Sequence, residues 1–174
     1  TGAVDSITTG DYNVGLGDSA GTAITTGNYN TAVGSLSLDA NTTGSSNTAL
    51  GTNALSSNTT ASNNIAIGLE ALLANTTGAS NTAAGKGALT ANTTGTDNVA
   101  IGMESLKENT TGSHNTAMGS YSLMTNTTAS NNTAFGRSAL KLTTTGTNNV
   151  AVGKSALLAN TTAAGGTAVG YAAL

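Results

Sequence analysis

Apolar and polar positions along this chain follow a pattern that returns every 17 residues. A typical copy, residues 47–63, begins Asn-Thr-Ala-Leu-Gly, continues to an Ala-Leu pair and ends Asn-Thr-Thr-Ala-Ser-Asn. The Gly that closes the first segment recurs without insertion or deletion at Gly17, Gly34, Gly51, Gly68, Gly85, Gly102, Gly119, Gly136, Gly153 and Gly170. Such a short fixed period is typical of a solenoid, in which each copy packs only against its neighbours. We therefore expect residues 1–174 to form one array of about ten copies, a segment of a longer fibre.

The three residues before each Gly predict a short β-strand. In Val99-Ala100-Ile101 a small central Ala lies between two residues of high strand propensity. Because successive strand side chains point to opposite faces, the Ala column faces a narrow interior and its neighbours face outward. The residue just before Gly varies in bulk, so we interpret its column as a candidate subunit interface, comprising Val33, Leu50, Ile67, Ile101, Met118, Phe135, Val152 and Val169.

A second apolar segment follows each Gly and ends in Ala-Leu or Ser-Leu. Its Leu column, every 17 residues, predicts a core position. Windows such as residues 70–74 suit one helical turn as well as a strand, and periodicity over so few residues does not distinguish the two.

The Asn-Thr-Thr triplet after the Leu predicts a corner, because Asn and the following Gly tolerate positive φ. We expect these corners to face solvent in ranks about 4.8 Å apart. Asn-x-Thr is also an N-glycosylation acceptor. The favoured alternative is structural, with Asn turning the corner and Thr hydroxyls hydrogen-bonding along the stack. The candidate glycosylation residues are Asn41, Asn58, Asn75, Asn92, Asn109, Asn126 and Asn160.

The dimensions of one coil indicate that the chain needs a partner. Seventeen extended residues give a perimeter of roughly 56 Å, which encloses only a flattened slot. Ten stacked coils make a rod roughly 48 Å long whose outward apolar column forms a continuous stripe. Three chains around one axis would bury that stripe in a closed arrangement. The sequence therefore predicts an all-β parallel β-roll or β-solenoid of 17-residue coils that forms a homotrimer or filament.

Composition narrows the possible partners and chemistry. Charged residues are 7% of the chain, against roughly 25% in ordinary domains, and the net charge is -3. We expect no nucleic-acid partner, and no membrane insertion, because no apolar run reaches roughly 18 residues. The one histidine, His114, and the scattered acidic and basic side chains are interpreted as surface groups. We predict no catalytic, cofactor-binding or metal-binding residues and no enzymatic activity.

The recurring Asn-Thr-Ala-Val-Gly and Asn-Val-Ala-Ile-Gly motifs, each followed by Ala-Leu, resemble head repeats of trimeric autotransporter adhesins. Phage tail-fibre shafts have motifs of the same style. The resemblance covers all ten copies and implies a trimeric, left-handed parallel β-roll in which residues 99–102 are structural. The chain departs from the family in its longer period and its inserted Asn-Thr-Thr-Gly corner. It also lacks the family's membrane anchor and coiled-coil stalk, and we therefore expect a fibre shaft or filament segment.

These observations lead to one functional hypothesis and two alternatives. We expect a structural fibre or filament segment, extracellular, on a cell surface or in a virion fibre, with an adhesive surface for a cell-surface glycan or receptor. The first alternative is a Thr-rich ligand- or ice-binding solenoid, although adjacent Thr59 and Thr60 should point to opposite faces. The second is an amyloid-like filament, against which the regularly spaced glycines favour a solenoid.

Overall fold

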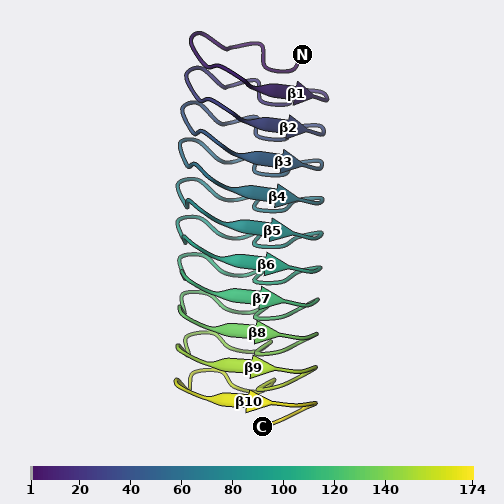
Figure 1. The fold of residues 1–174 in the computed structure, drawn as a ribbon, viewed down its shortest axis with the longest axis vertical. Helices are drawn as coiled ribbons and strands as arrows, with labels where there is room; N and C mark the ends of the chain where they lie inside the picture. Colours follow the sequence, from purple (N-terminus) through teal and green to yellow (C-terminus); the bar gives the residue numbers. More distant parts are fainter. Residues whose placement is uncertain (1) are drawn as a thin grey trace.

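The computed structural model describes residues 2–174 as a stack of coils with one short strand in each (Figure 1). All strands lie on the same side of the stack, and the two ends of the chain lie at opposite ends of it. The strands are β1 (Val14–Leu16), β2 (Thr31–Val33), β3 (Thr48–Leu50), β4 (Ile65–Ile67), β5 (Thr82–Ala84), β6 (Val99–Ile101), β7 (Thr116–Met118), β8 (Thr133–Phe135), β9 (Val150–Val152) and β10 (Thr167–Val169).

The strands form one parallel sheet in sequence order, β1 to β10. Pairing keeps the 17-residue register throughout: between β6 and β7, for example, Ala100 lies opposite Ala117. No helix occurs within residues 2–174. The prediction of an all-β parallel β-solenoid with 17 residues per coil is confirmed.

Backbone hydrogen bonds join neighbouring coils well beyond the strands. The amide of Gly51 donates to Val33 O at 2.8 Å, and Leu55 N donates to Ala71 O at 3.0 Å. In the corner, Thr76 N donates to Thr93 O at 3.0 Å. The coils are therefore linked on every side, as expected for a chain without proline.

Each strand ends at a glycine because no other residue fits there. Gly102 has a φ of 123°, and a Cβ atom built on it would lie 2.7 Å from the carbonyl carbon of Gly119 in the next coil. Side chains are disfavoured at this φ and would collide with the backbone at this distance. The glycine column thus allows neighbouring coils to stack closely where each strand ends.

The segment after each glycine is a turn, which resolves the ambiguity between helix and strand. Asn53 and Leu55 have φ values of 56° and 53°, and the same positions are positive in the other coils. The Leu column is buried as predicted, so an aliphatic side chain is held in a left-handed conformation that it ordinarily avoids. The inter-coil bond from Leu55 N and the buried side chain together hold it there.

The apolar half of the interior lies between the strand and this turn. It consists of the central Ala of each strand and the Ala-Leu or Ser-Leu pair of the turn, with Ala100 and Leu106 both fully buried. One Leu and two small residues per coil make this core thin. The opposite half of the interior is polar.

Candidate functional site

The Asn that opens each Asn-Thr-Thr triplet, here called the corner Asn, is buried, so the prediction that it faces solvent is wrong. Six of the seven have no exposed surface: Asn41, Asn58, Asn75, Asn92, Asn109 and Asn126. Asn160, in the last corner, is half-buried. The side chain turns inward because hydrogen-bond partners are available there, and a partnered amide tolerates burial.

The buried corner Asn side chains form a ladder along the rod. Asn75 Nδ2 donates to Asn58 Oδ1 at 3.0 Å, and Asn92 Nδ2 donates to Asn75 Oδ1 at 2.8 Å. Each Nδ2 also donates to the carbonyl three residues later, as Asn92 does to Gly95 O at 3.0 Å. Both amide hydrogens are therefore used inside the coil in every ladder side chain except Asn41, which begins the ladder and donates only to Gly44 O.

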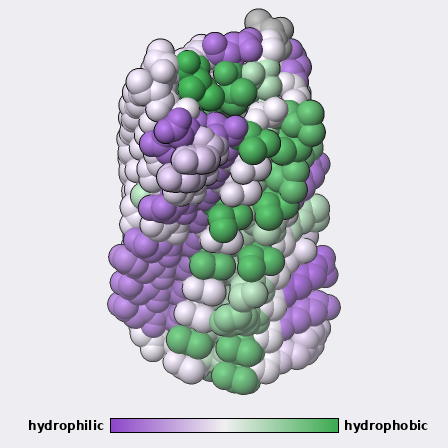
Figure 2. Space-filling view, turned by 45° about the horizontal axis from the view of Figure 1, so that its top comes forward, coloured by the Kyte–Doolittle hydropathy of each residue, from purple (hydrophilic) through white to green (hydrophobic). Residues whose placement is uncertain are grey.

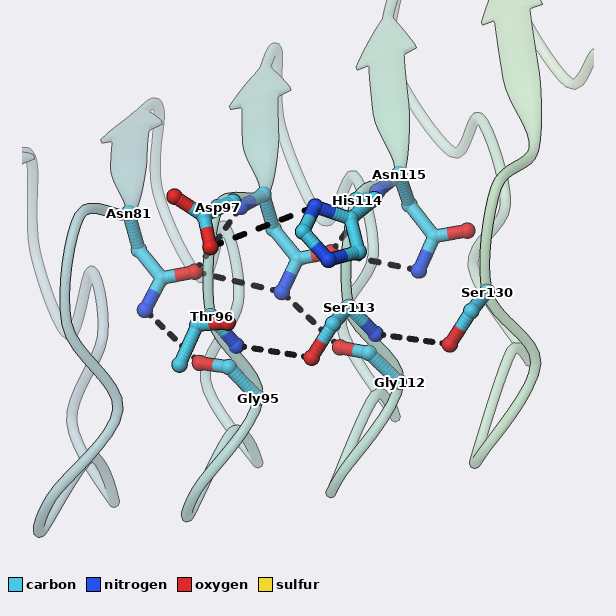
Figure 3. A network of polar contacts seen from close by, with 10 residues as sticks. Asn81, Gly95, Thr96, Asp97, Gly112, Ser113, His114, Asn115 and Ser130 are labelled. Carbon is cyan, nitrogen blue, oxygen red and sulfur yellow. Dashed lines mark hydrogen bonds and ion pairs between the residues drawn. The ribbon is translucent and has the colours of Figure 1, made fainter.

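A second ladder is formed by the residue before each strand, here called the pre-strand Asn. Asn98 N donates to Asn81 Oδ1 at 3.0 Å, and Asn81 Nδ2 donates to Gly95 O at 2.8 Å (Figure 3). The carbonyl of Gly95 thus accepts one bond from each ladder. Eight members are fully buried: Asn30, Asn47, Asn64, Asn81, Asn98, Asn115, Asn132 and Asn149.

This geometry opposes glycosylation of the folded coil at the six buried corner Asn residues. A glycan would be attached to Nδ2, and that atom lies in the interior, with one hydrogen engaged in Asn41 and both engaged in the other five. Asn160 differs, because the preceding coil has Thr143 in place of the Asn that would accept a bond from its Nδ2, and because its side chain is partly exposed. The contacts therefore support a structural role for the triplet, although the Asn acts as a buried ladder residue and not as the turn residue predicted from the sequence.

The two threonines of each corner have different environments. The hydroxyl of the first Thr donates to a backbone carbonyl of the next coil, as Thr93 Oγ1 does to Thr110 O at 3.0 Å. The second Thr is exposed in every copy, forming a single file along the rod. The prediction that Thr hydroxyls hydrogen-bond along the stack is confirmed for the first Thr of each pair.

Neither the corner Asn nor its Gly has a positive φ, so the prediction that a positive φ at these residues forms the corner is wrong; the chain bends at the two Thr between them. The positive φ lies instead two residues after that Gly, for example at Asp97 and His114. Side chains at this position are exposed and stack along the rod. Tyr12 and Tyr29 have ring centroids 5.1 Å apart and planes only 4° from parallel.

The outer face of the sheet carries the candidate interface residues. Figure 2 shows a column of apolar side chains running along one side of the rod. On this sheet face, defined by the first and third residues of each strand, Leu50, Ile67 and Ile101 expose 46%, 42% and 37% of their surface. Phe135 and Val152 expose 39% and 37%, Val169 exposes 72%, and Val33 and Met118 are half-buried. Leu69 and Met103, just after the glycine, extend the column sideways. The prediction that these residues point away from the coil interior is confirmed.

Ionisable groups are spread over the surface of the turns. His114 Nδ1 lies 3.9 Å from Asp97 Oδ2, with both side chains at least half exposed, and Lys107 Nζ lies 3.2 Å from Glu104 Oε2. The exception is Asp39, whose Oδ1 is buried without a hydrogen-bond partner. Burial raises the pKa of Asp39, opposed by the backbone amides of Asp39 and Ala40.

The described residues bring no catalytic constellation together. Residues 2–174 enclose no pocket and contain no group of three His, Cys, Asp or Glu side chains placed to hold a metal ion. No helix in this range has the length and apolarity to cross a bilayer. The most distinctive surface feature is therefore the apolar sheet face.

Sequence reasoning missed the polar interior, although the repeats carried a signal for it. The pre-strand position is Asn in nine successive copies, whereas the exposed position just before it holds Tyr29, Ser46, Asp97 or His114. A polar column that stays constant beside one that varies indicates a fixed internal partner.

Comparison of the chain with protein-family models, curated proteins and solved structures gives no match. The resemblance to adhesin head and tail-fibre repeats accordingly stays a prediction carried by the repeat motif alone.

Proposed function

We propose that this chain is a non-catalytic structural fibre or filament segment that self-associates through its sheet face and presents an adhesive surface. The observation that carries the proposal is the exposed apolar column, which runs over nine coil steps, a length of about 43 Å. Contiguous exposed apolar surface of this kind is typical of protein interfaces, because burying it releases ordered water.

A second copy of the chain is the partner that best suits this surface. The column is straight and repetitive, so identical rods match one another along their full length. A closed cyclic arrangement, the left-handed homotrimer implied by the motif, buries all copies of the column and leaves none for open-ended association. An extracellular, cell-surface or virion location is part of the proposal and is supported by the resemblance of the repeat motif to adhesin-head and tail-fibre repeats.

The test is the oligomeric state of the purified chain and of one matched pair of variants. Native mass measurement should give a trimer for the wild type and a monomer for Ile101→Asp, because three carboxylates would meet at the axis without partners. Thr111→Asp places the same charge on the exposed corner of the same coil and should remain trimeric. A wild-type chain that stays monomeric at micromolar concentration would refute self-association.

Cross-linking tests the orientation independently, since the chain contains no cysteine. A single Met118→Cys on the sheet face should form disulfide-linked pairs under oxidation, because identical positions meet in a parallel, in-register trimer. Thr111→Cys should not. Efficient cross-linking at both positions would point to non-specific contact instead.

The alternative of a Thr-rich ligand- or ice-binding solenoid is favoured by the exposed file of second threonines. Only one Thr of each pair is available, because the first is half-buried and hydrogen-bonded to the next coil. A single file presents no two-dimensional array, so this alternative ranks below the fibre. Thermal hysteresis measured on the wild type and on Thr94→Tyr would test it: activity lost in the variant would support ice binding.

A further inference from the structure

Charge is segregated along the rod. Residues 1–85 contain acidic side chains and no basic ones: Asp5, Asp11, Asp18, Asp39 and Glu70. Residues 109–174 contain Arg137, Lys141 and Lys154 and no Asp or Glu. Because the 17-residue register fixes the coil of every residue, this separation in sequence is a separation in space, and the basic side chains belong to the coils of β8 and β9.

These three cations lie against tyrosine rings. Arg137 Cζ is 6.0 Å and Lys141 Nζ is 5.7 Å from the centroid of the same Tyr121 ring, and Lys154 Nζ is 5.5 Å from that of Tyr171. Arg137, Lys154 and Tyr171 occupy the same position in three consecutive coils, so they form a row with steps of about 4.8 Å. The five residues are called the basic patch.

The basic patch has no counter-charge within the described part of the chain. The ion pairs found among residues 2–174 involve Lys107 and His114, and none involves the three cations of the patch. Arg137, Lys154 and Tyr171 are exposed, and Lys141 and Tyr121 are half-buried. Clustered cations without partners are available to an anion, and their attraction for it adds up over the patch.

We propose that the basic patch binds an acidic glycan, one that bears carboxylate or sulfate groups. Arg and Lys suit such groups through charge-assisted hydrogen bonds, and the tyrosines offer amphipathic surfaces for sugar rings. The half-buried hydroxyl-bearing residues Ser138 and Ser155 follow Arg137 and Lys154 directly in sequence and suit hydrogen bonds to sugar hydroxyls. The inference rests on the adhesive part of the proposed function and gives its ligand class.

A nucleic acid is the less suitable polyanion. Its continuous phosphate backbone would extend past three cations toward the acidic half of the rod, where repulsion replaces attraction. A short or sparsely charged glycan segment lying along the row meets one cation in each of two consecutive coils and a tyrosine in the next.

The experiment measures binding of the oligomer to heparin, with neutral dextran as the blank, at low ionic strength. Arg137→Ser with Lys141→Ser should weaken binding at least ten-fold. Lys86→Ser with Lys107→Ser removes two cations from the same two positions of the repeat outside the patch, and should change binding less than two-fold. Ser occurs naturally at both positions in other coils, at Ser35 and Ser56, so the fold should be retained.

Three results would overturn the proposal: no binding of the wild type to heparin, equal loss in both double variants, or equally strong binding to single-stranded DNA. Tyr171→Phe should bind like the wild type and Tyr171→Thr several-fold more weakly. Native mass separates the two proposals, because loss of heparin binding with an intact oligomer affects only the glycan site. A monomeric wild type that binds heparin through the patch would refute the self-association alone.

Discussion

Replacing Thr143 by Asn should stabilise the protein by extending the corner Asn ladder. Thr143 takes the corner Asn position in the coil after Asn126 and is fully buried. Its Oγ1 donates to Asn160 O at 2.9 Å and does not reach back to the preceding coil. Asn126 Oδ1 is consequently a buried acceptor without a partner.

The magnitude follows from the bonds that the new side chain can make. Asn126 itself donates at 2.7 Å to Asn109 Oδ1 and at 3.0 Å to Ala129 O. An Asn at 143 in the same conformation would donate to Asn126 Oδ1 and to Gly146 O. Satisfying a buried orphan acceptor is worth about 1–3 kcal/mol, reduced by about 1 kcal/mol for the lost Thr143 bond. The difference leaves an expected net gain of about 1 kcal/mol, within a range of about 0–2 kcal/mol.

Urea unfolding followed by circular dichroism measures the global effect, and amide hydrogen exchange measures the local one. Solenoids can unfold by segments, so the gain should appear first as stronger protection of residues 140–163. A shift of the thermal midpoint of about 2–4 °C per kcal/mol is expected for a chain of this size.

Two variants control for the ladder itself. Asn92→Thr should orphan Asn75 Oδ1 in the same way and destabilise by about 1–3 kcal/mol. Thr143→Ile introduces the residue that Ile24 provides at the same position, and so fills the space without supplying a donor. If Thr143→Ile stabilised as much as Thr143→Asn, apolar packing would be responsible, and the reasoning from the orphaned oxygen would be refuted.

The remaining predictions concern single coils. Gly102→Ala should destabilise by about 3 kcal/mol in urea unfolding, because its φ of 123° and the approach of Gly119 both exclude a Cβ; a loss below about 1 kcal/mol would contradict this. Thr110→Val should remove the hydroxyl bond to Thr127 O and cost about 1 kcal/mol, and unchanged stability would show that the bond contributes nothing. Burial raises the pKa of Asp39 above its usual value of 3.8, so the folded state holds the proton more tightly than the unfolded state. The free energy of unfolding should therefore fall as pH rises from 3.8 to the raised pKa of the folded protein, and stay level above it. Asp39→Ser should flatten this part of the stability profile measured between pH 3 and 7, and an unchanged profile would exclude Asp39 as its source.

The strands and their register were predictable because each depends on few neighbouring residues. A short triplet such as Val99-Ala100-Ile101 closed by Gly specifies an outward, inward and outward alternation. The fixed period then places every triplet beside its own copy in the next coil. No long-range information beyond the repeat is needed, so pattern reasoning succeeds.

The turn after the glycine could not be assigned from propensity. Leu72 is a good helix former and the core residue of its coil, yet it has a φ of 53°. The inter-coil bond from Leu72 N to Ala88 O and the burial of its side chain hold it in this conformation, and both depend on the neighbouring coils. Two copies of the repeat do indicate the turn in their sequence. Gly21 and Gly87, which adopt positive φ readily, occupy turn positions at which the other coils have positive φ.

The prediction that the Asn of the Asn-Thr-Thr corner faces solvent was wrong for a different reason. Asn, Thr and Gly are correctly read as a break in the strand pattern, but the inference from polarity to exposure assumes that polar groups lack internal partners. In a repeat, a buried Asn inside the ladder has an identical neighbour one coil away. Asn58 and Asn75 can therefore be buried at little cost, since each satisfies the other.

The polar interior has a consequence for how the outer surface should be understood. The two Asn ladders and the Ala-Leu core hold the coil together without help from any outward side chain, so exposed columns are free to vary. The exposed position two residues after the corner Gly does vary from coil to coil, and its residues are mainly polar. The last residue of each strand is equally free, and Thr would satisfy its strand propensity. Instead it is Leu, Val, Ile, Met or Phe in nine of ten strands, with Ala84 the exception. Since nothing inside the coil requires an apolar residue there, this column is the main support for the proposal that the sheet face packs against another copy of the chain.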